Sequence, residues 1–261
     1  MSEPTLTVTR LAASRSADAV LLVGAGLGTS AEALWSSVAG LLADGTEVLG
    51  VDLPGHGRSP AAGAGFTVTE LASAVRGLAV DVAVGRPVYY AGVSLAGAVA
   101  IELAIEPGPF RAVAALAAAA RIGVPEGWRE RADLVRRAGT PVLVSGSAER
   151  WFAPGFIERD PTAANRLLLA LSATDDTSYV RCCEALTGFD ATARLGSVAA
   201  PLLLGPGAHD SVVTVAQAEA TAEATPGAAV RVFDRCAHQP PVEDPVAVAT
   251  TLTTHFWEVA R

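Results

Sequence analysis

One serine in the chain stands where a strand-like segment turns directly into a helix-like one. Ser94 follows the apolar run Val88–Gly92 and precedes Leu95–Ile105, whose pattern predicts a helix. Gly92 is the small neighbour that such a sharp turn requires, and Ala96 stands where a second glycine is usual. The turn lifts the hydroxyl above a sheet at a helix N-terminus, which favours developing negative charge. Ser94 is therefore the candidate nucleophile, and a serine that only caps the helix is the alternative.

A serine becomes a strong nucleophile only when a base removes its proton and an acidic residue orients that base. Asp210 follows the apolar run Pro201–Gly205, and His238 follows the run Val230–Phe233. Because the carboxyl ends of parallel strands lie at one edge of a sheet, Ser94, Asp210 and His238 are predicted to meet there. The order serine, acid, histidine is one of the known orders of such triads. The three residues predict acyl transfer through a covalent intermediate.

The other three histidines fit the role of the base less well. His255 lies within the predicted C-terminal helix, and His209 directly precedes the acid. His56 lies on a glycine-rich loop, which predicts a structural turn. Asp234 is the alternative acid, but it is too near to His238 in the sequence to reach the far nitrogen of the ring comfortably.

Two backbone amides are needed to hold the oxyanion that forms during acyl transfer. The amide of Leu95 directly follows the serine, and the amide of Leu27 lies on the glycine-rich loop after the run Ala19–Val23. Gly26 and Gly28 let the backbone of this loop approach a substrate. Such a loop is also typical of dinucleotide sites, but G-x-G-x-x-G is not formed, since position 29 is threonine. Leu27 and Leu95 are therefore the predicted oxyanion hole.

Apolar runs alternate with helical patterns along most of the chain, which is typical of βαβ units on a mostly parallel sheet. The predicted strands are Leu6–Arg10, Ala19–Val23, Glu47–Val51, Val88–Gly92, Ala112–Leu116, Pro201–Gly205 and Val230–Phe233. The predicted helices are Ser30–Leu42, Val68–Val84, Leu95–Ile105, Val213–Ala224 and Asp244–Val259. The fold class is therefore α/β, with a mostly parallel central sheet flanked by helices.

One stretch interrupts this alternation. Residues 123–196 have helical patterns and are rich in arginine and large aromatic side chains, although Pro141–Ser145 has a strand-like pattern with no place in the sheet. We expect residues 1–122 and 197–261 to form the core. Residues 123–196, here called the cap segment, are expected to form a small helical lid inserted over it.

The composition excludes several classes of protein. A chain of 261 residues with 51% hydrophobic and 18% charged residues can bury a sizeable core, which argues against disorder. All 19 basic residues are arginines and the 27 acidic residues outnumber them, so nucleic-acid and membrane partners are not expected. The longest apolar stretch, residues 112–120, is about half of a membrane span. With three cysteines, no signal-peptide pattern and no zinc spacing, a cytoplasmic location is expected; oligomeric state stays open.

These motifs resemble those of the α/β-hydrolase superfamily, in the same order and across nearly the whole chain. The similarity rests on the loops at residues 25–29 and 51–59, the serine turn, and the histidine loop with residues 242–245. Within the superfamily the chain is similar to the 3-oxoadipate enol-lactonases (β-ketoadipate enol-lactone hydrolases). That narrower similarity rests on motifs of the cap segment: Trp128-x-x-Arg131, Val135-Arg136, Arg150-Trp151-Phe152, Tyr179–Leu186 and Asp190.

The resemblance implies a carboxylic ester hydrolase that opens 3-oxoadipate enol-lactone, a small lactone bearing a carboxylate, within the β-ketoadipate pathway of bacterial aromatic-acid breakdown. Arg150 with Trp151 is the first candidate to bind that carboxylate and Arg131 is the next, while salt bridges and packing inside the cap are the alternative. This chemistry needs no metal, nucleotide or redox cofactor. Alternatives are a general carboxylesterase or another small-lactone hydrolase, with perhydrolase activity as a side reaction. An inactive small-molecule receptor is the alternative from a different class.

Overall fold

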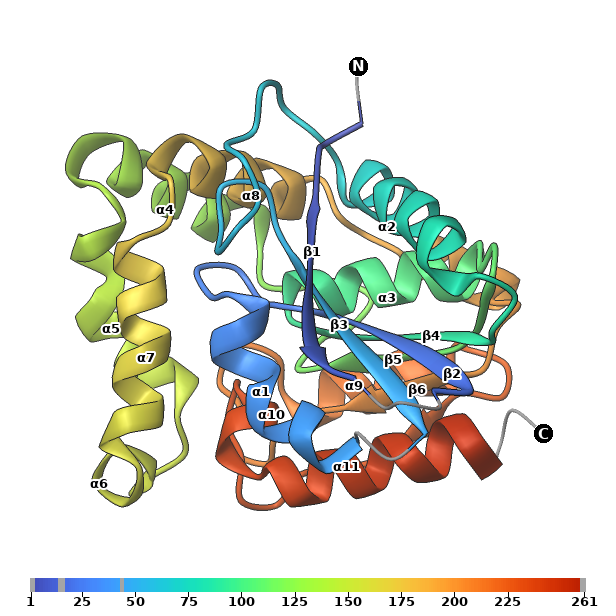
Figure 1. Ribbon diagram of the computed structural model, residues 1–261. Coiled ribbons are helices and arrows are strands. Elements are labelled where there is room, and N and C mark those ends of the chain that lie inside the picture. Colours follow the sequence, from blue (N-terminus) through green and yellow to red (C-terminus); the bar gives the residue numbers. More distant parts are fainter. Residues whose placement is uncertain (1–2, 14–16, 43–44, 259–261) are drawn as a thin grey trace.

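The computed structural model describes residues 3–13, 17–42 and 45–258, and its centre is a seven-stranded sheet (Figure 1). The strand order is β1-β3-β2-β4-β5-β6-β7. All neighbouring strands run parallel except the edge pair β1 and β3. The strands are β1 (Thr7–Ala12), β2 (Ala19–Gly24), β3 (Thr46–Asp52), β4 (Val88–Val93), β5 (Phe110–Leu116), β6 (Leu202–Gly205) and β7 (Ala229–Val230). The predicted α/β class is confirmed.

Helices cover both faces of the sheet, which explains why its central strands are continuous apolar runs. Helices α1 and α11 lie on one face, and α2 and α3 lie on the other (Figure 1). Helix α9 contacts β6 and β7. The bounds are α1 (Ala31–Leu42), α2 (Val68–Ala83), α3 (Leu95–Ile105), α9 (Val215–Glu223), α10 (Pro240–Glu243), α11 (Pro245–Thr253) and the π-helical turn η3 (Thr254–Glu258).

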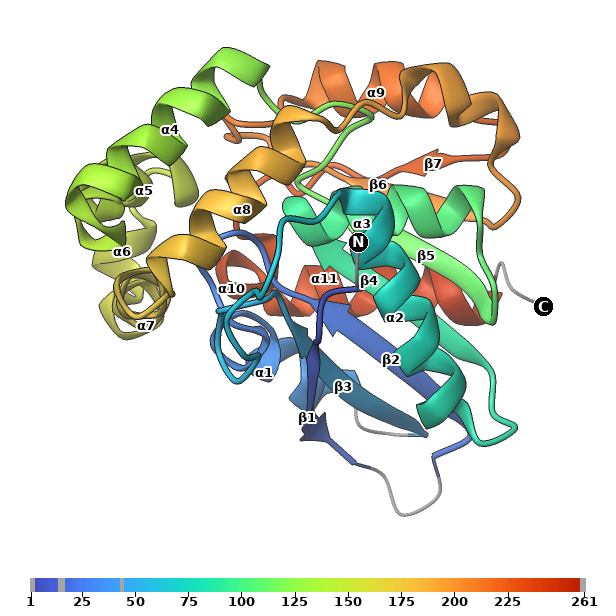
Figure 2. The same cartoon turned by 90° about the horizontal axis from the view of Figure 1, so that it is seen from above.

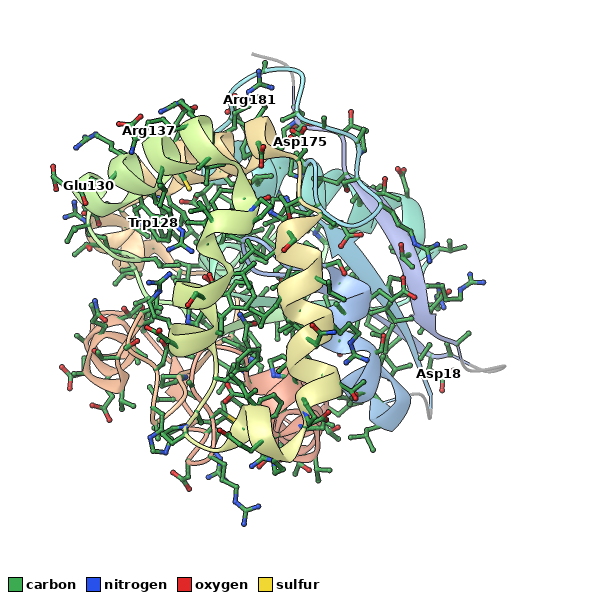
Figure 3. All side chains as sticks on the ribbon, turned by 90° about the vertical axis from the view of Figure 1, so that its left-hand side faces the viewer. Asp18, Trp128, Glu130, Arg137, Asp175 and Arg181 are labelled. Carbon is green, nitrogen blue, oxygen red and sulfur yellow. The ribbon has the colours of Figure 1, made fainter. Side chains whose placement is uncertain are left out.

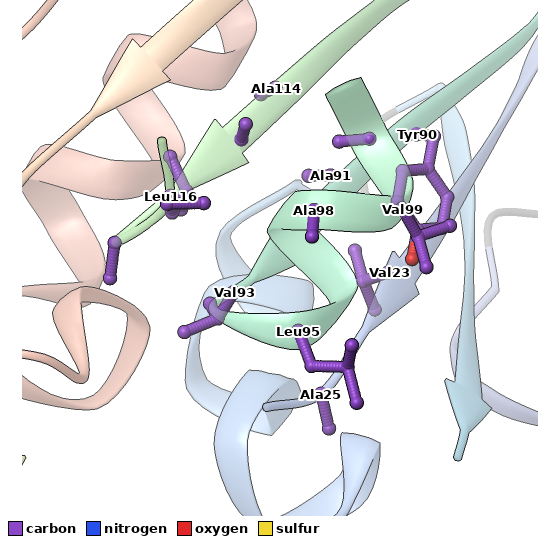
Figure 4. Packing of buried hydrophobic residues seen from close by; sticks show 14 of the residues in the cluster. Val23, Ala25, Tyr90, Ala91, Val93, Leu95, Ala98, Val99, Ala114 and Leu116 are labelled. Carbon is purple, nitrogen blue, oxygen red and sulfur yellow. The ribbon is translucent and has the colours of Figure 1, made fainter. Parts of the chain in front are cut away.

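Helix α3 is buried along almost its whole length, which fixes the position of the serine that precedes it. Figure 4 shows Leu95 and Ala98 of this helix among core residues that include Val23 of β2. Small side chains permit this close approach, because a Cβ atom on Gly97 would lie 2.5 Å from the Cβ of Ala118. In a core packed to the density of a crystal, such a helix has little freedom to shift.

The cap segment consists of helices between β5 and β6. Its elements are α4 (Pro125–Ala138), η1 (Thr140–Leu143), α5 (Val144–Trp151), α6 (Phe156–Arg159), α7 (Pro161–Ser172), α8 (Asp176–Thr187) and η2 (Thr192–Ser197). Helices α4 to α8 stand at the end of the sheet where the parallel strands have their carboxyl ends (Figures 1 and 2). Helices α4 and α8 pack against each other, and Figure 3 shows Glu130 and Arg137 on the outer side of α4.

The strand-like run Pro141–Ser145 is helical, so that interpretation of its pattern was wrong. Thr140, Leu143, Ser147 and Trp151 are buried, whereas the residues between them are exposed or half-buried. Buried positions three or four residues apart match the period of a helix and not that of a strand. Packing of one face against the rest of the cap therefore overrides the β-branched composition.

Two further predictions differ from the structure near the C-terminus. The strand predicted at Val230–Phe233 is shorter, because ladder pairing covers Ala229–Val230 and an isolated bridge joins Gly207 to Phe233. The helix predicted at Asp244–Val259 ends its α-helical part at Thr253 and continues as a π-helical turn. Val259 lies outside the described residues.

The described helices include none that is long and apolar enough to cross a membrane. Cys182, Cys183 and Cys236 are buried free thiols. Burial raises the pKa of Cys183 to about 12. A thiol with a raised pKa and no access to solvent is a packing residue and not a nucleophile.

Candidate active site

Ser94 lies at the tight turn between β4 and α3. Its backbone angles, φ 57° and ψ −115°, are rarely adopted by a residue with a side chain. The turn leaves no room at Gly92, where a Cβ atom would lie 2.0 Å from the carbonyl oxygen of Ala96. Ala96 itself fits because Gly24 faces it, and a Cβ atom on Gly24 would lie 2.7 Å from the Ala96 methyl. The turn is therefore compatible with alanine at the position of the usual second glycine.

A carboxylate and an imidazole meet on the loops after β6 and β7. Nδ1 of His238 lies 2.8 Å from Oδ2 of Asp210. The other oxygen of Asp210 accepts hydrogen bonds from the amides of Val212 and Val213, at 2.7 and 3.1 Å. Both members of the pair are buried. The carboxylate is thus held in place, and Nε2 of the imidazole is left for a partner on the other side of the ring.

Backbone contacts explain how residues so far apart in the sequence come together. The amide of His209 donates to the carbonyl of Cys236 at 2.9 Å, which ties the loop after β6 to the loop after β7. The loops touch so closely that a Cβ atom on Gly207 would lie 2.0 Å from the carbonyl oxygen of Ala237. Asp234, the alternative acid, is exposed, so it is not the carboxylate that meets the imidazole.

The serine and the histidine line one cavity between the sheet and the cap segment. Its volume is 320 Å³. The lining residues are Leu27, Ser94, Ser211, Val212 and His238 from the core and Gly123, Val124, Gly127, Trp128, Arg131, Arg150, Trp151 and Tyr179 from the cap segment. No cluster of three or more metal-binding side chains occurs in the part of the chain that the structure describes.

The loop after β2, which carries Leu27, contacts the serine turn through Gly26. A Cβ atom on Gly26 would lie 3.4 Å from the Cβ of Ser94, so the two segments are in contact. The amide and hydroxyl of Thr29 both donate to the carbonyl of Gly26, at 3.0 and 2.8 Å, which closes the loop into a turn. Within the described ranges the amides of Leu27 and Leu95 have no protein acceptor. The two predicted donors thus lie on segments that contact each other, and Leu27 lines the cavity; their role as an oxyanion hole stays a prediction.

Two arginines of the cap segment face the same cavity. Arg131 donates through Nε to the phenol oxygen of Tyr179 at 2.7 Å and through Nη2 to Oγ of Ser147 at 3.3 Å. Neither Arg131 nor Arg150 forms an ion pair with a described residue. Burial, and then repulsion from Arg131, lowers the pKa of Arg150. The two guanidinium groups at the cavity are thus not paired with any carboxylate of the described residues.

Tyr179 was not predicted as a site residue, although it lines the cavity and holds Arg131. Its ring is 1% exposed, and burial raises the pKa of its hydroxyl well above the ordinary value. The ring also stacks near His56, with 6.4 Å between centroids. Nδ1 of His56 lies 2.9 Å from the carbonyl of Pro54, and burial lowers the pKa of His56 to about 4. No spacing in the sequence relates Tyr179 to Arg131, because only the packing of α4 on α8 brings them together.

The chain belongs to the alpha/beta hydrolase family, whose family model matches residues 19–251. It is 31% identical over 228 residues to 3-oxoadipate enol-lactonase 2 of Acinetobacter baylyi. This match covers 87% of this chain and 84% of that protein. The crystal structure of the enol-lactonase from Burkholderia xenovorans LB400 matches with a TM-score of 0.87 and 29% identity, over 95% of this chain and 94% of that one. The resemblance to enol-lactonases is confirmed.

A more distant structure shares the fold alone. A thermophilic esterase from Thermogutta terrifontis matches with a TM-score of 0.88 at 20% identity, over 98% of this chain and 94% of that one. Together, the family and its enol-lactonase members support a hydrolase of ester or lactone bonds.

Proposed function

We propose that the protein is a serine hydrolase that opens a small enol-lactone bearing a carboxylate, with 3-oxoadipate enol-lactone as the substrate. The observation that carries this proposal is the composition of one cavity. Ser94 and His238 lie on its core side, while Arg131 and Arg150, without acidic partners among the described residues, lie on its cap side. A volume of 320 Å³ suits a compact ligand.

The proposed reaction is acyl transfer to water. His238, oriented by Asp210, removes the proton of Ser94 while the serine oxygen attacks the lactone carbonyl. The amides of Leu27 and Leu95 hold the oxyanion, at the N-terminus of α3 where negative charge is favoured. The ring opens as His238 gives the proton from Ser94 to the enol oxygen, which stays on the acyl chain, and the enol tautomerises to a ketone. Water activated by the same histidine then frees the acid.

The carboxylate of the substrate is proposed to bind Arg150 beside Trp151. Two N–H groups of Arg131 already donate to Tyr179 and Ser147, whereas the guanidinium of Arg150 makes no hydrogen bond within the described residues. A guanidinium with unused donors in a partly dry site is suited to bidentate binding of a carboxylate. Arg131 then adds long-range attraction. We further propose that residues 123–196 act as the lid that carries this anion site.

The test compares kcat/KM for 3-oxoadipate enol-lactone with kcat/KM for δ-valerolactone and 4-nitrophenyl acetate, which carry no carboxylate. The expected result is a value above roughly 10⁴ M⁻¹s⁻¹ for the enol-lactone, with a large preference over both neutral compounds. Similar slow turnover of all three compounds would reassign the protein as a general carboxylesterase. A single turnover of the activated ester, without repeated turnover, would instead favour a receptor of this fold.

A further inference from the structure

The loop that carries His238 is joined to the cap segment through one buried carboxylate. Glu243, the last residue of α10, is 4% exposed. Its Oε1 accepts hydrogen bonds from the amides of Ala237 and Gln239, at 2.9 and 3.0 Å. Its Oε2 accepts a hydrogen bond from the amide of Ala153 at 2.6 Å. The two oxygens of one side chain therefore hold two segments that are far apart in the sequence.

Both of these segments carry residues that line the cavity. Ala237 and Gln239 flank His238, and Ala153 follows Trp151 by two residues. A further hydrogen bond joins the segments directly, from the amide of His238 to the carbonyl of Trp151 at 3.1 Å. The contacts of this carboxylate thus help to set the distance between the imidazole and the wall that Trp151 forms.

A carboxylate is the side chain suited to such a double contact. Both of its oxygens accept hydrogen bonds, whereas a glutamine in the same place has one acceptor and one donor. Glu243 has no ion pair with any described residue. Burial raises its pKa, although the three amides act in the opposite direction. A buried anion without a cation is costly to keep, and the three amide hydrogen bonds offset part of this cost.

Several charges act on the imidazole of His238. Asp210 lies at hydrogen-bond distance from Nδ1, and the carboxylate of Glu243 accepts from the amides on both sides of His238. The other titratable or charged groups around these side chains are Cys236, Asp234, Asp244, His209 and Arg159, with Arg131 and Arg150 across the cavity. The positive charge of the two cavity arginines disfavours a protonated ring. The negative charge of the two carboxylates acts in the opposite direction.

We propose, on the basis of the hydrolase mechanism above, that Glu243 is a positioning residue for the reaction. It holds the His238 loop against the cap segment, and its negative charge adds to that of Asp210 when His238 takes the proton of Ser94. The imidazolium that forms at that moment is stabilised by a second nearby carboxylate. Removal of the charge therefore weakens the base and also loosens the loop.

The test pairs Glu243→Gln with Glu102→Gln. Glu102 on α3 is 3% exposed, pairs with Arg194, and lies outside the cavity. With 4-nitrophenyl acetate as the probe, Glu243→Gln is expected to lower kcat about tenfold. It is also expected to move the acid limb of the kcat/KM profile to lower pH, because the neutral ring persists to lower pH without the second carboxylate. Glu102→Gln is expected to lower the melting temperature with kcat and the acid limb unchanged.

A second variant separates charge from shape. Glu243→Asp keeps the charge on a side chain shorter by one methylene, so we expect a reduced kcat with the acid limb at its wild-type position. NMR titration of the His238 ring reports the same contrast without turnover. Its midpoint is expected to fall in Glu243→Gln and to stay in place in Glu243→Asp.

The proposal would be overturned if Glu243→Gln kept both the kcat of the wild type and the acid limb of its kcat/KM profile. If that variant does not fold, wild-type kcat in Glu243→Asp would overturn it instead. A wild-type protein without any esterase turnover is a different outcome, since it would remove the hydrolase function itself. In that case the catalytic part of the proposal falls too, and the NMR titration still shows whether the Glu243 charge acts on His238.

Discussion

The two sides of the cavity are built in different ways. On the core side, Ser94, Asp210 and His238 lie on short loops at the carboxyl ends of β4, β6 and β7, where backbone hydrogen bonds and close glycine contacts determine their positions. On the cap side, Arg131 and Arg150 extend from helices, and Arg131 is placed by side-chain hydrogen bonds to Tyr179 and Ser147.

This difference indicates that the two sides of the cavity serve different parts of the reaction. Positions set by the backbone of a buried sheet change only when the core changes, so they suit reaction steps that require a fixed geometry. Positions set by side chains on surface helices change with single substitutions, so they suit the choice of substrate. Substitutions on the core side are therefore expected to change kcat, and substitutions on the cap side are expected to change the choice of substrate.

The largest effect is expected on the core side, from Ser94→Ala. Loss of the nucleophile is expected to lower kcat/KM for 4-nitrophenyl acetate by about 10³-fold or more. The thermal unfolding midpoint should not fall, because the hydroxyl makes no hydrogen bond to a described residue and the strained backbone is unchanged. Retained turnover would contradict the assignment of the serine and with it the proposed role of the core side.

A second effect is expected at the contact between the two sides, at His56. Burial lowers its pKa to about 4 in the folded chain, from an ordinary value of 6.5. A histidine with a lowered pKa contributes stability above pH 6.5 and loses this contribution as the pH falls toward 4. The free energy of unfolding should therefore decrease by up to about 3 kcal/mol over this range through His56 alone.

The measurement is chemical denaturation between pH 7 and pH 4. His56→Gln is expected to flatten the pH dependence, while His209→Gln, which changes an exposed histidine, should leave it as in the wild type. Some slope remains in both variants because burial also lowers the pKa of His255. An unaltered slope in His56→Gln would show that its neutral ring does not support the contact with Tyr179.

On the cap side, Arg150→Met tests selectivity. The variant removes the charge and keeps a long apolar side chain, so KM for the anionic enol-lactone is expected to rise about 10- to 100-fold. KM for 4-nitrophenyl acetate should change little. Arg129→Met is the matched control, because Arg129 lies on the same cap and pairs with Glu126 in solvent. Equal losses on both substrates would assign Arg150 to packing of the cap.

The smallest effect is expected from Tyr179→Phe, which keeps the ring and removes the oxygen that accepts from Arg131. Loss of one such hydrogen bond is worth about 1 kcal/mol, so KM for the enol-lactone should rise about fivefold with kcat unchanged. Tyr89→Phe removes a hydroxyl from the core, where the ring stacks on Phe256, and serves as the control. A fall in kcat alone would place Tyr179 with the residues of the core side.

The sequence by itself was enough to identify most elements of the core and the strand-end residues, because those signals are local. A sharp turn after a strand requires small neighbours such as Gly92, and strands covered on both faces are continuous apolar runs. The same reasoning placed Asp210 and His238 on successive strand ends, and the structure brings their side chains to 2.8 Å.

Only the tertiary structure decided how the cap segment meets the core. The period of buried positions in Thr140–Trp151 becomes evident once their packing partners are known, and composition alone favoured a strand at Pro141–Ser145. The hydrogen bonds from Arg131 to Tyr179 and from Ala153 to Glu243 join segments whose separation in the chain carries no signal. Local turns follow from steric rules between neighbouring residues, whereas contacts between distant helices depend on how whole elements pack.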